Sequence, residues 1–67
     1  MAEFVMLTDI CDDAIWLRVD AIIMVEPWYT ERVVIKGATI TLRDGEKINV
    51  QEMTDEIMTR IWEVKHD

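Results

Sequence analysis

The chain has 67 residues, of which 51% are hydrophobic, and its 14 acidic and 7 basic residues give a formal net charge of −7. This length excludes two domains, the hydrophobic content excludes an acidic disordered tail, and a single cysteine excludes an internal disulfide. No apolar stretch approaches the ~20 residues of a membrane helix, and the acidic start Met1-Ala2-Glu3 lacks the basic flank of a signal peptide. We therefore expect a single cytoplasmic domain over residues 1–67.

The first half of the chain has the patterns of β-strands. An apolar run predicts a strand over residues 3–8, a period of two predicts a second over 14–19, and a further apolar run predicts a third over 22–27. Pro27 has no N–H, so it either stops ladder pairing or marks an edge strand.

A β-hairpin follows, with strands predicted over residues 33–42 and 46–51. A two-residue turn at Asp44-Gly45 would place apolar and polar side chains on the same face. A three-residue loop over 43–45 keeps the faces apart, because it sets Leu42 opposite Glu46 and the other apolar residues opposite one another. Its pairs are Ile40 with Ile48, Ala38 with Val50, Thr41 with Lys47, and Thr39 with Asn49. We therefore predict the longer loop, with Gly45 left-handed and a second bulge at Gly37.

The C-terminal segment predicts an amphipathic helix over residues 53–64. Met53, Ile57, Ile61 and Val64 recur at spacings of four, four and three, and Met58 and Trp62 extend the same side. Acidic residues precede basic ones along it, as the helix dipole prefers. The expected fold is α+β: a five-stranded antiparallel, strongly curved or half-barrel sheet followed by one C-terminal helix.

One helix cannot cover both faces of such a sheet, which indicates a homo-oligomer or a protein partner. The candidate interface residues are the apolar and aromatic side chains Phe4, Met6, Trp16, Trp28 and Tyr29. Two alternatives stay open: Trp28 folds back over the core, or a rolled half-barrel covers its own second face.

The chain has no pattern of residues typical of an enzyme or of a cofactor site. It contains no phosphate-binding loop, catalytic triad or zinc spacing, and so small a chain hardly encloses a substrate pocket. Cys11 has acidic neighbours, which disfavour a nucleophilic thiolate, and His66 has no second metal ligand in sequence reach. We predict no catalytic, metal or cofactor-binding residues.

The acidic balance disfavours direct binding to nucleic acid, which needs a basic stripe. The basic group of Arg32, Lys36, Arg43 and Lys47 lacks interleaved aromatic residues. An acidic inhibitor or nucleic-acid mimic that binds a basic protein is the alternative function. Its candidate surface consists of Asp9, Asp12, Asp13 and Asp20.

The order of motifs resembles the small bacterial flagellar and swarming-motility proteins of the FlbD type. The motifs are Leu7-Thr8, Val19-Asp20-Ala21-Ile22, Val25-Glu26, the stretch from Thr39 to Val50, Gln51-Glu52, Glu56-Ile57 and Ile61. The chain departs from that pattern in a longer connection from Glu26 to Thr39, and in Met53, where a small capping residue is usual. The resemblance implies a non-enzymatic β-rich protein linked to motility, and a phage-encoded accessory protein fits the same features.

Overall fold

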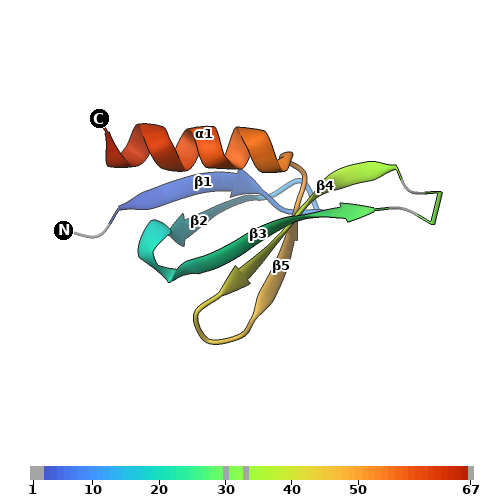
Figure 1. Cartoon of the computed structure of the whole chain (residues 1–67), viewed down its shortest axis with the longest axis horizontal. Coiled ribbons are helices and arrows are strands. Elements are labelled where there is room, and N and C mark those ends of the chain that lie inside the picture. The colour runs from blue at the N-terminus through green and yellow to red at the C-terminus, as the bar shows by residue number, and fades with distance from the viewer. Residues whose placement is uncertain (1–2, 30, 33, 67) are drawn as a thin grey trace.

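The computed structural model describes residues 3–29, 31–32 and 34–66, and it has the predicted α+β class (Figure 1). Five antiparallel strands precede one C-terminal helix. The elements are β1 (Phe4–Thr8), β2 (Ala14–Arg18), a short 3-10 turn η1 (Val19–Ala21), β3 (Ile22–Tyr29), β4 (Ile35–Leu42), β5 (Lys47–Val50) and α1 (Thr54–Lys65). Val33, the expected start of the fourth strand, lies outside the described residues.

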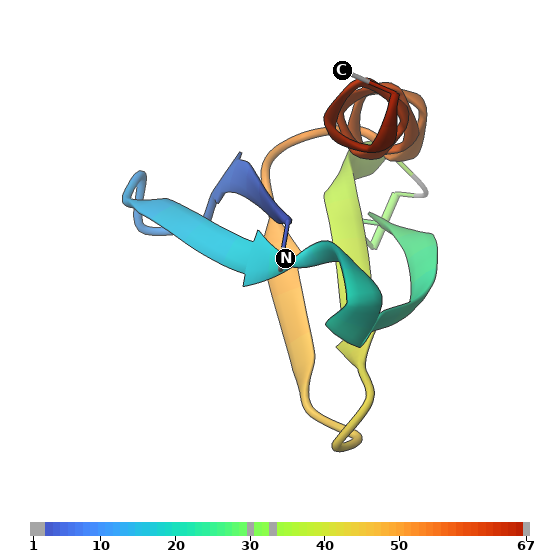
Figure 2. The same ribbon diagram turned by 90° about the vertical axis from the view of Figure 1, so that its left-hand side faces the viewer.

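The strands form two sheets, so the expectation of a single five-stranded sheet is wrong. One sheet contains β1 and β2, and the other has the order β3-β4-β5. Within the described residues, one isolated bridge, between Asp9 and Val50, joins them, and the sheets are not closed. The sheets stay separate because Asp9 directly follows the end of β1 and Val50 is the last residue of β5. Antiparallel pairing beyond this bridge would need the turn after Asp9 or the entry to α1, so the two hairpins diverge (Figure 2).

The β4–β5 hairpin has the predicted register. Ile40 lies opposite Ile48, and Thr39 lies opposite Asn49, with a 2.7 Å hydrogen bond between the two polar side chains. The Leu42 N–H donates to the Glu46 carbonyl at 2.8 Å, which closes the three-residue loop. Gly45 has a φ of 92° and is left-handed, as the loop requires.

β3 continues through Pro27 and is one of the two edge strands of its sheet. Pro27 lies opposite Ala38. The Leu42 N–H bonds to β5, and peptide groups alternate along a strand, so the peptide group of Ala38 also faces β5. The missing N–H of Pro27 therefore faces the free edge, where no ladder bond is lost. Of the two readings of Pro27, the edge is the correct one.

Trp28 folds back across the sheet over Gly37. Its indole N–H donates to the Val50 carbonyl at 3.1 Å, and a Cβ at position 37 would overlap that carbonyl oxygen. Glycine is needed here because it lets the indole cross β4. The register steps from Trp28–Gly37 to Tyr29–Ile35, which leaves Lys36 as the bulged residue beside the position predicted for a bulge.

Replacing Gly37 with alanine is therefore expected to lower the free energy of unfolding by about 2–3 kcal/mol, because the new methyl group must displace β5 or the indole. Gly45→Ala is the matched control: nothing lies within 4 Å of its added Cβ, and its backbone strain alone should cost about 1 kcal/mol. Urea unfolding measures both. Equal losses in the two variants would contradict this account of Gly37.

The buried core lies between the two sheets and α1. It consists of Val5, Leu7, Val19, Ala38, Ile40, Val50 and Ile57. The helix contributes Ile57 fully and Ile61 and Val64 in part, whereas Met58 and Trp62 are exposed. The apolar face predicted for the helix, which included Met58 and Trp62, is therefore wider than the face that contacts the core. Within the described residues, no helix has the length and hydropathy needed to span a membrane.

Candidate functional site

The free edge of β1 is covered by side chains that take the place of a neighbouring strand. Val19 N–H donates to the Glu3 carbonyl, so peptide groups of odd-numbered β1 residues face β2 and those of Phe4, Met6 and Thr8 face away. The Arg60 guanidinium donates to the Met6 carbonyl at 2.8 Å. Thr8 N–H donates to both Glu52 carboxylate oxygens, at 2.9 and 3.1 Å.

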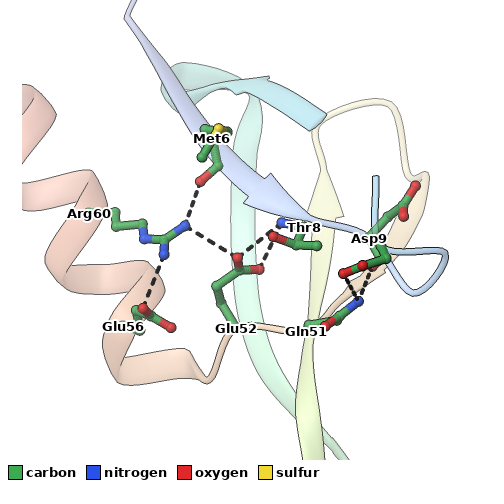
Figure 3. Close-up of polar contacts among 8 residues, drawn as sticks. Met6, Thr8, Asp9, Gln51, Glu52, Glu56 and Arg60 are labelled. Carbon is green, nitrogen blue, oxygen red and sulfur yellow. Dashed lines mark hydrogen bonds and ion pairs between the residues drawn. The ribbon is translucent and has the colours of Figure 1, made fainter. Parts of the chain in front are cut away.

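Glu52 and Arg60 also form an ion pair with each other at 3.3 Å, and Arg60 pairs with Glu56 at 3.1 Å (Figure 3). Burial of the Glu52 carboxylate acts to raise its pKa. The hydrogen bonds from Thr8 and the charge of Arg60 outweigh that effect, so the pKa of Glu52 lies below its ordinary value. The contacts of Glu52 in this network therefore hold α1 against the edge of β1 most strongly when Glu52 is ionised.

Sequence analysis missed this network, because it assigned no contact to Glu52, which lies just before the predicted helix. The helix instead begins at Thr54, and Met53 is an N-cap without a side-chain hydrogen bond. The spacing of four between Glu56 and Arg60 does signal their exposed pair. No local pattern signals the buried contact of Glu52, because Thr8 lies 44 positions away in the chain.

Replacing Glu52 with glutamine is expected to lower the free energy of unfolding by about 1–3 kcal/mol, because a buried charge-assisted bond to Thr8 is lost. Glu56→Gln is the matched control. It removes an exposed pair with the same arginine and should cost less than about 0.5 kcal/mol. Chemical denaturation followed by circular dichroism checks the difference. A control as damaging as Glu52→Gln would show that the buried carboxylate has no special role.

Glu52 also makes stability depend on pH. Its pKa is lower in the folded chain than the ordinary 4.5, so its contribution is complete above that value and is lost as the pH falls through the folded pKa. Wild-type protein should therefore lose stability below about pH 4.5. Glu52→Gln should show a shallower loss in thermal melts over the same range. Parallel pH profiles for the two proteins would contradict the assignment.

The outer face of the β1–β2 hairpin brings three of the predicted interface residues together. Phe4, Met6 and Trp16 are 47%, 42% and 64% exposed, and Met6 lies directly opposite Trp16 across the strands. With Val5, Arg60, Glu63 and Val64 they line an open groove of about 270 Å3. The groove thus has an apolar floor on the hairpin and a charged rim on α1.

The other two predicted interface residues lie on β3, in the second sheet. Tyr29 is exposed at the end of that strand, whereas Trp28 is half-buried and bonded to Val50. Trp28 therefore has the position of the alternative prediction, in which its side chain folds back over the fold. The structure therefore separates Trp28 and Tyr29 from the groove on β1 and β2.

The four candidate acidic residues do not form one surface. A carboxylate oxygen of Asp9 accepts the N–H groups of Cys11 and Asp13 at 2.9 and 3.0 Å, which stabilises the turn between β1 and β2. Asp12 belongs to the same turn, with a φ of 68°. Asp20 follows the opposite end of β2 and pairs with Arg18 at 3.0 Å.

Among the described residues no three His, Cys, Asp or Glu side chains are grouped to hold a metal ion. His66 stacks on Trp62 with ring centroids 4.4 Å apart, and Cys11 is a free, exposed thiol. Comparison with protein-family models, with curated proteins and with solved structures finds no significant match.

Proposed function

We propose that this chain is a small non-enzymatic protein–protein interaction module that self-associates through the outer face of its β1–β2 hairpin. The observation that carries the proposal is the groove, in which Phe4, Met6 and Trp16 are exposed together. Tryptophan contributes more than most residues to protein interfaces, and burying grouped apolar side chains is the main driving force for association.

The hairpin suits this role because its position is held firmly on its other side. Val5 and Leu7 of β1 are buried in the core, and Glu52 and Arg60 bond the edge of the strand. A surface fixed in this way loses little conformational freedom on binding, which favours affinity. Tyr29 offers a further exposed aromatic contact, and Trp28 supports the fold.

The proposal includes a cytoplasmic, bacterial or phage-encoded accessory protein, in line with the FlbD-type resemblance. A single exposed thiol without a disulfide partner suits a reducing compartment.

The bridge between Asp9 and Val50 supports the two sheets acting as one strongly curved, half-barrel-like surface. The acidic-inhibitor alternative is not part of the proposal, because its four acids lie at opposite ends of β2.

Sedimentation equilibrium from low micromolar to millimolar concentration tests self-association. Wild-type protein should dimerise, and Trp16→Thr should weaken the dimer by at least about tenfold, because it removes the largest exposed side chain of the groove. Trp62→Gln is the matched control, since Trp62 is 60% exposed but lies outside the groove, and it should leave the dimer intact. A wild-type monomer throughout the range would overturn the proposal.

A further inference from the structure

The sheet edges differ in how they are protected against pairing with another strand. Native proteins commonly block exposed edges with charges, proline, bulges or short strands. The edge of β1 is bonded by Glu52, Arg60 and Gln51. β3 has Pro27 and two register shifts, and β5 has only four residues, with Lys47 at one end and the bridge to Asp9 at the other.

The outer edge of β2 has fewer of these blocks, since the one charged residue of the strand, Arg18, lies at its end and pairs with Asp20. Its five residues pair with β1 in unbroken register, without a bulge or a proline. Since Val19 N–H bonds to Glu3, the alternation turns the peptide groups of Ala14, Trp16 and Arg18 away from β1. β2 ends its two-stranded sheet, so no strand of the described chain takes these groups.

We propose that the β2 strands of two copies pair antiparallel about a two-fold axis at Trp16, which makes a four-stranded sheet across the dimer. This inference rests on the proposed self-association and specifies its geometry. In this register Trp16 lies opposite Trp16, and Ala14 lies opposite Arg18 of the second copy. Every outward peptide group of the strand then has a partner, whereas a shift by two residues leaves Ala14 or Arg18 without one.

The side chains and charges agree with the same register. On the inner face, Ile15 lies opposite Leu17 of the second copy, so apolar residues meet. On the outer face, a row runs from Met6 through the two Trp16 side chains to the second Met6, so the two Trp16 side chains lie side by side and cover part of each other. Arg18, which pairs with Asp20 in its own chain, approaches the acidic turn of Asp12 and Asp13 in the second copy, where its charge attracts their carboxylates and offsets part of their repulsion with Asp20.

Pairwise cysteine cross-linking tests the register. In a Cys11→Ser background, Ala14→Cys and Arg18→Cys chains are mixed and mildly oxidised. Bonded antiparallel pairs have Cα atoms about 5.5 Å apart, within the range that a disulfide spans. The mixture should give a covalent heterodimer at least about tenfold faster than either variant alone, because same-site cysteines are several residues apart. A mixture of Lys47→Cys and Arg18→Cys is the matched control. It should form a covalent heterodimer no faster than either of these two variants alone forms a covalent homodimer.

Amide hydrogen exchange gives a second measurement on the unmodified chain. The N–H groups of Ala14, Trp16 and Arg18 should exchange at least about tenfold more slowly at millimolar than at low micromolar concentration. Ile15 and Leu17 bond to β1 and should be protected at both concentrations. A dimer in sedimentation without the Ala14–Arg18 link and without this protection would overturn edge pairing, while the proposed self-association would stand. A monomer at all concentrations would overturn both.

Discussion

The structure depends on how the second edge of β1 is satisfied. β1 pairs with β2 on one side, but on the other side β5 meets it only at the bridge between Asp9 and Val50. Peptide groups left without partners beside a core are costly. The Glu52 carboxylate and the Arg60 guanidinium supply the missing partners, and they do so from the start and the middle of the C-terminal segment.

That contact also decides which surfaces stay exposed. It fixes α1 alongside β1 (Figure 1), with Ile57 in the core and with Met58 and Trp62 exposed. The helix then covers the edge of the hairpin and leaves its outer face open, where Met6 and Trp16 lie. The exposed apolar surface is therefore a direct consequence of how the helix is used.

A second copy suits this arrangement for a reason of size. A domain of ~60 residues buries only about 60% of the surface of its unfolded chain, so it has few means to cover every apolar side chain itself. The proposed pairing through β2 would extend the sheet and place the two Trp16 side chains beside each other without any rearrangement of the fold. The protected edges of β1 and β3 leave β2 as the edge through which a regular ladder can grow.

The sequence by itself determined the features that depend on local periodicity and backbone conformation. A period of two separated the faces of the β4–β5 hairpin, and the need to keep Ile40 and Ile48 on one face selected its loop, with Gly45 left-handed. A period near 3.6 located the helix to within one residue at each end. Sequence reasoning also named Phe4, Met6 and Trp16 among five candidate interface residues, but it did not separate them from Trp28 and Tyr29.

Only the tertiary structure decided which elements meet. The bonds from Thr8 to Glu52, from Arg60 to Met6 and from Trp28 to Val50 join residues 44, 54 and 22 positions apart. The division into two sheets depends on where β1 and β5 leave each other, and the separation of Tyr29 from Trp16 follows from it. Periodicity tells which way a side chain points from its own strand or helix. Periodicity does not tell which residue of another element that side chain contacts, because this contact depends on how the whole chain packs.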